Sequence, residues 1–219
     1  MTITIGITKL DELLGGGIRD SIITDIFGPS GTGKTQLTLQ ICVNSLTNNG
    51  IILYQDTSGG FRPERLLDLL KAKNMEPKLL DRVTVGRITN TAEQLSYVDK
   101  ILEIKNISLV VIDNITDLFS FEYSKESSSL AKHIAFMEYM HKLALVTVQK
   151  KIPVVVTNII RKSNDDEREN LDRSISMFTH RKIRLTKIDH KYAAEALPSF
   201  GSKKLAYYII THNGLVDLP

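Results

Sequence analysis

The stretch SIITDIFGPSGTGKTQLTLQICVNSLTN, from Ser21 to Asn48, decides the fold because it contains an apolar strand, a glycine-rich turn and a helix in unbroken succession. The turn has the pattern GxxxxGK[ST], in which successive backbone N–H groups form a cradle for phosphate oxygens. The helix adds the positive end of its dipole. A chance glycine-rich loop would not have both flanking elements in place, so the stretch predicts a nucleotide-binding α/β domain.

Each residue type in the turn has a physical reason to be there. Glycines allow positive φ angles and a close approach of the backbone to the ligand. Lys34 supplies a point charge for the β and γ phosphates, and the Thr35 hydroxyl is the expected ligand of Mg²⁺. A nucleoside triphosphate with Mg²⁺ is therefore the predicted ligand. The predicted cradle consists of Gly28, Pro29, Ser30, Gly31, Thr32, Gly33, Lys34, Thr35 and Gln36.

Length and composition set the class of protein. The 219 residues, 42% hydrophobic and 24% charged, predict one globular domain over 1–219, with 1–20 as an entry segment. No apolar run approaches the roughly 20 residues of a membrane span, and the first residues lack the pattern of a secretory signal. A cytoplasmic protein without a membrane partner is expected. Cys42 is the single cysteine, which excludes a disulfide within the sequence.

Downstream of the turn, short apolar strands alternate with helices. Helices are predicted over 63–73, 91–105 and 127–150, the last from Leu130, Ile134, Met137, Leu145 and Val148 at helical spacing. Strands without alternation, over 51–56, 82–85, 109–113 and 153–158, predict a doubly wound, mostly parallel sheet. Residues 180–188 and 205–211 predict antiparallel strands at one edge. The polar stretch 161–173 predicts a mobile loop.

The ends of two predicted strands carry the candidate chemistry. Asp113 follows four apolar residues and is the expected second anchor of Mg²⁺, with an Asp that caps the next segment as the alternative. Hydrolysis also needs a group that orients or deprotonates water. The strand that ends at Asp56 offers that carboxylate and then Ser58, whose hydroxyl is no base at neutral pH. Asp56 is a weak catalytic candidate, since a structural role in the following loop suits it better.

Five stretches together resemble the RecA/RadA recombinase superfamily, and most of all its RadB branch, archaeal paralogues of RadA that consist of the ATPase core alone. They are KLDELLGGGI at 9–18, GPSGTGKTQ at 28–36, DTSGGFRPER at 56–65, VVID at 110–113 and PVVVTN at 153–158. The resemblance implies a RecA-like P-loop NTPase fold, ATP as the nucleotide, and a role in homologous recombination and DNA repair. It also implies that Arg65 lies against the adenine base, which suits a planar guanidinium.

The sequence departs from the family pattern at two positions that matter for hydrolysis. Ser58 stands where the active recombinases carry the water-activating glutamate, and Ile159 stands where they carry a glutamine that senses the γ-phosphate. The family's DNA-binding loop is reduced to an acidic stretch that contains Asn164, Asp165, Asp166, Glu167 and Glu169, which would repel a phosphate backbone. We therefore expect at most a weak ATPase without efficient strand exchange.

Positive charge concentrates in the last third of the chain, where 161–204 carries 11 Lys/Arg against 7 Asp/Glu. The candidate DNA contacts are Arg161, Lys162, Arg181, Lys182 and Arg184, although alternation along a strand separates Arg181 from Lys182 and Arg184. A solvated basic edge strand is the alternative interpretation. The resemblance implies DNA, a RadA-type recombinase or other recombination proteins, and further copies of the chain as partners. Two other functions stay open: a DNA-stimulated strand-exchange ATPase, and a KaiC-like signalling ATPase that binds no DNA.

Overall fold

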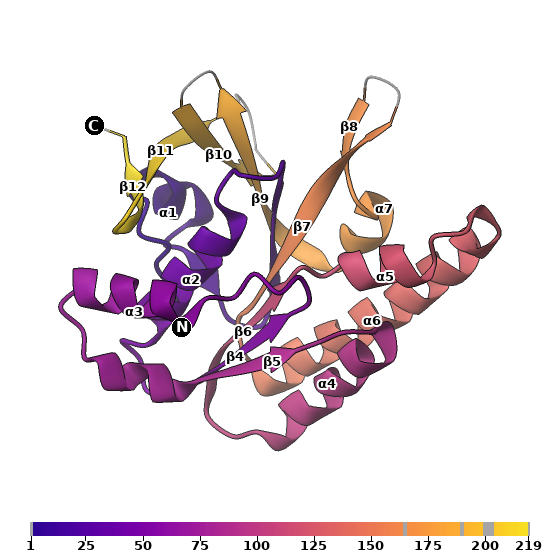
Figure 1. The fold of residues 1–219 in the computed structure, drawn as a ribbon, viewed down its shortest axis with the longest axis horizontal. Coiled ribbons are helices and arrows are strands. Elements are labelled where there is room, and N and C mark those ends of the chain that lie inside the picture. Colours follow the sequence, from indigo (N-terminus) through magenta and orange to yellow (C-terminus); the bar gives the residue numbers. More distant parts are fainter. Residues whose placement is uncertain (1, 164–165, 189–190, 199–203, 219) are drawn as a thin grey trace.

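The computed structural model describes residues 2–163, 166–188, 191–198 and 204–218, and its centre is one large β-sheet (Figure 1). The strands of this sheet lie in the order β12-β11-β10-β9-β3-β7-β6-β4-β5, and β8 pairs with β7 outside this path. Their bounds are β3 Ile23–Gly28, β4 Ile51–Asp56, β5 Val83–Arg87, β6 Ile107–Asp113, β7 Val154–Ser163, β8 Asp166–Glu169, β9 Thr179–Ile188, β10 Lys191–Leu197, β11 Leu205–Thr211 and β12 Gly214–Asp217.

The sheet is parallel in its middle and antiparallel at one edge. Strands β9, β3, β7, β6, β4 and β5 run parallel to one another. Strands β10, β11 and β12 add antiparallel pairs beyond β9. The predicted α/β fold, with a mostly parallel sheet and antiparallel strands near the C-terminal end, is confirmed. A small separate ladder joins β1 (Thr2–Ile3) to β2 (Ile18–Arg19).

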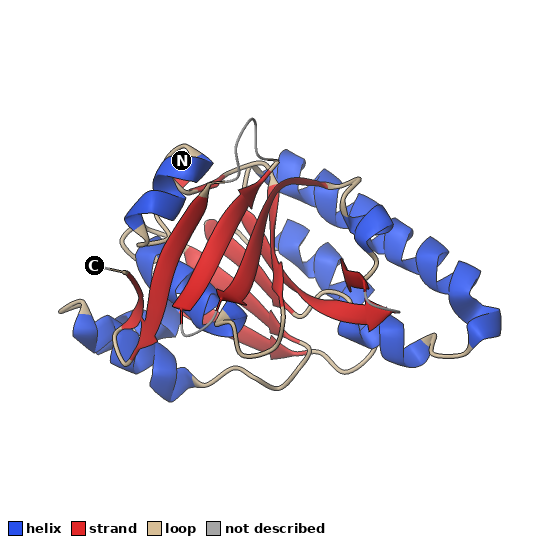
Figure 2. Ribbon diagram, turned by 90° about the horizontal axis from the view of Figure 1, so that it is seen from above, coloured by secondary structure: helices blue, strands red, loops and turns tan. Residues whose placement is uncertain are grey.

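Helices cover both faces of the sheet (Figure 2). Alternation along the inner strands sends side chains into two separate apolar clusters, because Leu109 and Val111 belong to one cluster and Val110 and Ile112 to the other. None of the helices in the described part of the chain is long and apolar enough to cross a membrane. On the first face lie α1 (Thr8–Leu14), α2 (Lys34–Ser45) and α3 (Pro63–Ala72); on the second lie α4 (Thr91–Glu103), α5 (Asp117–Glu122), α6 (Ser129–Lys150) and α7 (Asp172–Ile175).

Segments from the two ends of the chain meet on α2. The buried Gln40 donates from Nε2 to the carbonyl oxygens of Ile5 and Leu215, at 2.9 and 3.0 Å. Its Oε1 accepts the backbone N–H of Leu215 at 2.7 Å. One amide side chain therefore satisfies three backbone groups that would otherwise be buried without partners.

The prediction of a loop over 161–173 is wrong for the described part of that segment. Strand β7 continues to Ser163, and β8 returns beside it in an antiparallel pair in which Ile160 lies opposite Glu169. Residues Asn164 and Asp165, counted in the acidic stretch, lie outside the described residues. Polar composition misled the prediction because a two-stranded ribbon is held by backbone hydrogen bonds, which polar side chains do not prevent. In Figure 1 this hairpin extends away from strands β9 and β10, which lie beyond β3 in the sheet.

The long helix α6 buries a different face from the one whose spacing predicted it. Phe136, Tyr139 and Met140 are fully buried, and Phe136 and Tyr139 pack around the ring of Phe119 from α5. Most of the apolar residues that predicted the helix instead face outward, namely Leu130, Ile134, Leu145 and Val148. The helix is therefore apolar on two sides, of which the sheet covers one.

Candidate nucleotide-binding site

The glycine-rich turn connects β3 to α2, as predicted, at the carboxyl end of the parallel strands. Gly28 admits no side chain, since a Cβ there would lie 2.3 Å from the carbonyl oxygen of Leu185 in β9. Gly33 precedes α2 with a φ of 90°, which suits glycine. The Tyr208 hydroxyl from β11 donates to the Thr32 carbonyl at 2.7 Å and fastens the turn to the antiparallel edge.

Lys34, the first residue of α2, folds back over the turn. Its Nζ donates to the carbonyl oxygens of Gly28 and Pro29 at 2.8 and 2.9 Å. Burial lowers the pKa of Lys34, and the negative charges of Asp113 and Asp117 oppose that shift without reversing it. An ammonium group that is partly desolvated and bonded to neutral carbonyls gains from a nearby anion, so Lys34 is suited to bind phosphate.

Asp113 lies at the end of β6 within reach of three hydroxyl donors. Its Oδ2 accepts from Thr35 and from Tyr54, both at 2.8 Å, and its Oδ1 accepts from Thr157. The carboxylate is 4% exposed, and burial together with its charge raises the pKa of Tyr54. Thr35 and Asp113 are thus brought together as predicted. A hydroxyl and a carboxylate beside a phosphate cradle form an oxygen donor set that fits Mg²⁺, which retains most of its waters.

Asp56 and Ser58 occupy the position where a water-activating group is expected. Asp56 accepts the backbone N–H groups of Ser58, Gly59 and Gly60 on Oδ1 and that of Phe61 on Oδ2, at 2.7–3.1 Å. Arg87 lies 3.4 Å from the same carboxylate. Because four amides and a guanidinium already surround the carboxylate, Asp56 holds the loop, as the structural alternative predicted. The Ser58 hydroxyl lies 3.3 Å from Asp56 Oδ1.

The neighbouring strand β7 ends in a buried polar network. Asn158 is fully buried, donates to Glu169 Oε1 and to the Asn170 carbonyl, and accepts from Thr116 at 2.7 Å. Ile159 follows it beside Gly28 in the register of β3 and β7. The network therefore joins the strand next to the turn with the start of α5 and with β8.

Arg65 fastens two elements beside the turn. Its Nε donates to Gln36 Oε1 at 2.7 Å, and its Nη1 and Nη2 donate to the carbonyl oxygens of His212 and Thr211 at 2.6 and 2.9 Å. The structure therefore gives Arg65 a bridging role between α3, α2 and the β11–β12 turn. The stacking of its plane on an adenine base, which the family resemblance implies, stays a prediction.

The five candidate DNA contacts do not form one surface. Arg161 and Lys162 belong to the hairpin end of β7, whereas Arg181 lines a hollow of about 440 Å³ with Arg19 and His180 beside the start of β9. Arg184 lies opposite Glu195 in the β9–β10 register. The prediction that Lys182 contacts DNA does not fit the structure, because its Nζ lies 3.6 Å from Asp25 and 3.0 Å from Asp172 and also bonds Glu169.

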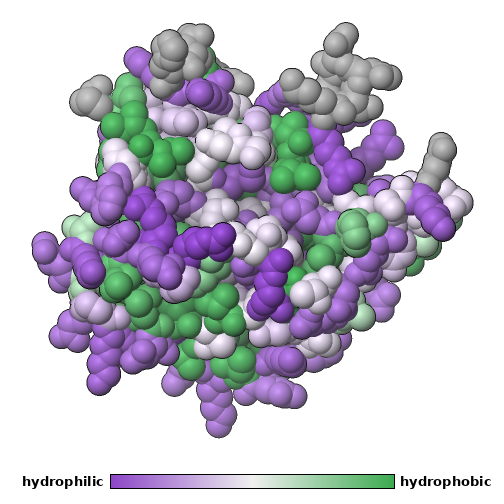
Figure 3. Space-filling model, in the orientation of Figure 1, coloured by the Kyte–Doolittle hydropathy of each residue, from purple (hydrophilic) through white to green (hydrophobic). Residues whose placement is uncertain are grey.

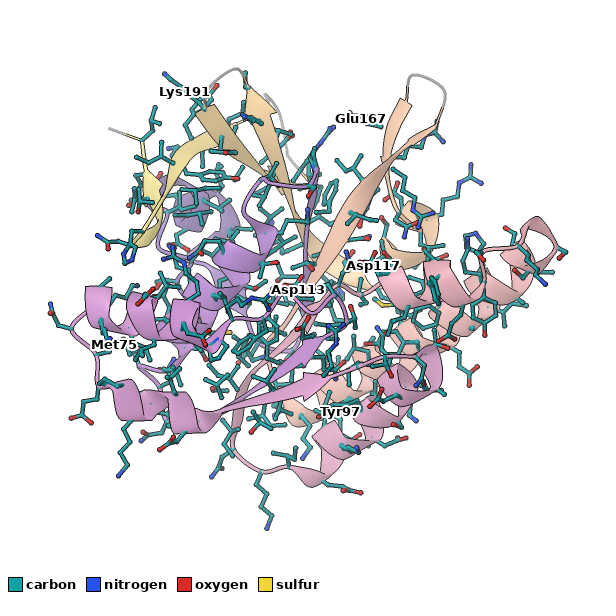
Figure 4. The ribbon with its side chains drawn as sticks, in the orientation of Figure 1. Met75, Tyr97, Asp113, Asp117, Glu167 and Lys191 are labelled. Atoms are coloured by element: carbon teal, nitrogen blue, oxygen red, sulfur yellow. The ribbon has the colours of Figure 1, made fainter. Side chains whose placement is uncertain are left out.

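Two functional groups near the turn were not predicted from the sequence. Thr157 binds Asp113, and its place at the polar end of an apolar strand was an available signal. Asp117, the first residue of α5, lies near Asp113 in Figure 4. Burial raises the pKa of Asp117, the cations of Arg161 and Lys34 lower it, and the charge of Asp113 raises it. No feature of the sequence indicated a role for Asp117, because no helix was predicted over 117–122.

A sheet that is parallel around β3, a GxxxxGK[ST] turn that leads into α2, and a carboxylate at the end of β6 define a P-loop nucleotide-binding protein of the RecA type. The model of the Rad51 family matches residues 1–175. The chain belongs to the Rad51 family.

Individual relatives carry the names RadA and RadB. The chain is 36% identical over 173 residues to the DNA repair and recombination protein RadA of Cenarchaeum symbiosum, which covers 74% of this chain and 44% of that protein. It is 30% identical over 224 residues to the DNA repair and recombination protein RadB of Pyrococcus horikoshii, which covers 99% of this chain and 95% of that one. RadB of Pyrococcus abyssi is 34% identical over 161 residues. The chain thus spans under half of the RadA relative and nearly all of the first RadB relative.

Proposed function

We propose that this protein is a RadB-like accessory factor of homologous recombination and DNA repair that binds Mg·ATP and hydrolyses it slowly. The observation that carries the proposal is that the phosphate-binding turn is complete, whereas a carboxylate that could activate water is missing beside it. Lys34, Thr35 and Asp113 converge at the turn, whereas Asp56 is occupied by backbone amides and Ser58 offers only a hydroxyl. ATP then acts chiefly as a ligand that orders the turn and the neighbouring strand ends.

The proposal includes partners. RadA and RadB relatives are named for DNA repair and recombination, so we assign this chain DNA and a RadA-type recombinase as partners in the cytoplasm. Arg161 and Arg181 are the DNA-contact candidates with the strongest structural support, since Arg161 is exposed on the hairpin and Arg181 lines a hollow with Arg19 and Asp20. Phosphate contacts of this kind weaken steeply as salt increases.

ATP turnover tests the proposal. We expect slow turnover by the native chain, with little change on addition of single-stranded DNA, and no turnover by Lys34→Ala. Ser58→Glu restores a carboxylate where water activation requires one and should raise the turnover rate by about tenfold or more. Ser58→Gln, which is matched in size but carries no charge, should leave the rate unchanged.

The alternatives give different results in the same assay. Fast turnover that single-stranded DNA stimulates would identify a strand-exchange ATPase and contradict the proposal. Turnover without any salt-dependent affinity for DNA would favour a KaiC-like signalling ATPase.

A further inference from the structure

Helix α6 exposes a face that is nearly free of charge. All 22 of its residues are described, nine of them are exposed, and Glu138 is the one member of the nine with a formal charge at neutral pH. Leu130, Ile134, Leu145 and Val148 are 73%, 59%, 56% and 60% exposed. Helices on the surface of a globular protein normally present polar and charged residues to water, so this face is unusual.

The four apolar residues form one continuous stripe. Their spacings of 4, 11 and 3 residues, with His141 between Ile134 and Leu145, follow the 3.6-residue period along one side of the helix. Over 18 residues the stripe is about 27 Å long. Scattered apolar residues need no explanation, but a contiguous apolar patch with few charges marks a contact surface. In the view of Figure 3, the end of the molecule where α5 and α6 lie has apolar areas interspersed with polar surface.

Two polar side chains beside the stripe already have partners within the chain. Lys142 Nζ lies 2.7 Å from the Asp99 carboxylate of α4, and His133 Nδ1 lies 3.0 Å from the Ser174 hydroxyl of α7. These side chains keep their partners when another molecule covers the stripe, so their burial leaves neither of them without a partner.

We propose that α6 pairs with α6 of a second copy of this chain, antiparallel, about a two-fold axis between Glu138 and His141. In this arrangement Ile134 lies opposite Leu145 of the other copy, and Leu130 lies opposite Val148. Glu138 then lies opposite His141 twice, so the single charged residue of the exposed face meets a hydrogen-bond donor. A parallel pair would place Glu138 against Glu138, which is unfavourable. The two Glu138–His141 hydrogen bonds thus favour a second copy in the antiparallel orientation.

The size of the surface sets the strength of the pairing. A helix of 22 residues is about 33 Å long and about 10 Å wide, which gives a footprint of roughly 300 Å² per copy. Stable interfaces bury about 800 Å² per partner, so the pair is weak and dissociates at micromolar concentrations. The turn that binds nucleotide lies next to α2 on the other face of the sheet, and pairing through α6 leaves it open.

Sedimentation velocity of the full chain from about 1 to about 200 µM measures the pairing. We expect a monomer–dimer equilibrium, and Ile134→Lys should weaken it at least tenfold. Tyr207→Lys alters a residue that is 43% exposed on β11 and should leave the equilibrium unchanged. Circular dichroism spectra of both variants verify the fold. A chain that stays monomeric over this range, or a dimer that Ile134→Lys does not weaken, would overturn the proposal.

Cysteine cross-linking tests the orientation, because Cys42 is fully buried and unreactive towards a second copy. The double variant Ile134→Cys with Leu145→Cys should form disulfide-linked dimers under mild oxidation. Ile134→Cys alone should not, because the two copies of this position lie about 16 Å apart along antiparallel helices. Efficient linkage of Ile134→Cys alone would contradict the antiparallel arrangement. Glu138→Lys should weaken pairing, and the addition of His141→Glu should restore it.

Discussion

Lys34 and Lys182 differ in what surrounds their ammonium groups. Lys34 bonds two carbonyl oxygens, and burial lowers its pKa more than Asp113 and Asp117 raise it. Burial also acts on Lys182, but Asp25 and Glu169 outweigh it and raise the pKa of Lys182. The side chain of Lys182 is 13% exposed and bonds Glu169 and Asp172. One cation is available to a ligand, whereas the other is neutralised by the protein itself.

The groups bonded to a buried ammonium group separate binding lysines from structural ones. A desolvated ammonium group without a bonded carboxylate gains free energy when an anion arrives, and one enclosed by carboxylates does not. Both lysines follow or belong to strands of the same sheet, so sequence position alone does not separate them. Replacement of Lys182 by Met should lower the stability of the fold, whereas the same replacement of Lys34 should lower the affinity for nucleotide.

The largest expected effect is on stability. Lys182→Met leaves the buried Glu169 carboxylate without its cation and should lower the free energy of unfolding by about 3–5 kcal/mol. Urea denaturation measures it. Lys187→Met, a control at an exposed position of the same strand, should change the free energy of unfolding by less than about 1 kcal/mol, since it loses only a contact of Lys187 with the Tyr192 ring. Equal effects at the two positions would remove the distinction between the lysines.

Lys34→Met should act on binding instead. The affinity for Mg·ATP should fall by about 2–4 kcal/mol, because the charge that faces the phosphates is lost. The free energy of unfolding should stay within about 1 kcal/mol of the native value, since no buried carboxylate is bonded to Lys34 in the described structure. Calorimetric titration measures the affinity, and Lys187→Met again serves as the control. Unchanged affinity in Lys34→Met would contradict the assignment of the cradle.

Asp113→Asn tests the part of the site that is predicted to bind Mg²⁺. The amide keeps the shape of the carboxylate but loses the charge that attracts Mg²⁺, so affinity for Mg²⁺ in the presence of nucleotide should fall about 10- to 100-fold. Without Mg²⁺ the affinity for nucleotide should not fall, because a negative charge near the phosphates is removed. Titrations with and without EDTA separate the two quantities. A loss of affinity that is equal in both conditions would show that Asp113 acts on the nucleotide rather than on the metal.

The smallest effect concerns Asp25, and it depends on pH. Burial, followed by the charge of Glu169, raises the pKa of Asp25 well above its usual 3.8. The folded state therefore holds this proton more tightly than the unfolded state, and the associated stability is present below pH 3.8 and is lost as pH rises. Asp25→Asn should be more stable than the native chain by about 1 kcal/mol at pH 8 and by less at pH 4. Denaturation at the two pH values tests the sign.

The sequence predicts the elements that carry local signals. The turn between β3 and α2, the placement of Asp113 opposite Thr35, and the structural role of Asp56 all follow from residue types at fixed spacings. The strands β9 and β11 follow from their β-rich composition, although β9 pairs parallel with β3 as well as antiparallel with β10. These predictions depend on short-range chemistry, which a sequence displays directly.

Partners that come from distant segments were not predictable in the same way. Lys182 was assigned to DNA because its charge is visible in the sequence, whereas its partners Asp25, Glu169 and Asp172 come together only through strand pairing. The hairpin of β7 and β8 was missed because polar residues read as a loop. The buried face of α6 was missed because that helix has two apolar sides, and periodicity does not tell which one packs on the sheet.

Gln40 links both terminal segments of the described chain to the helix that begins at Lys34. Ligand binding that steadies this helix must also slow the opening of the hydrogen bond from the Leu215 amide, because opening it breaks a bond to the same side chain. Deuterium uptake at Leu215, some 180 residues downstream of the phosphate loop in sequence, would thus follow the occupancy of that loop. Exchange at β12 would therefore report nucleotide binding at the turn between β3 and α2.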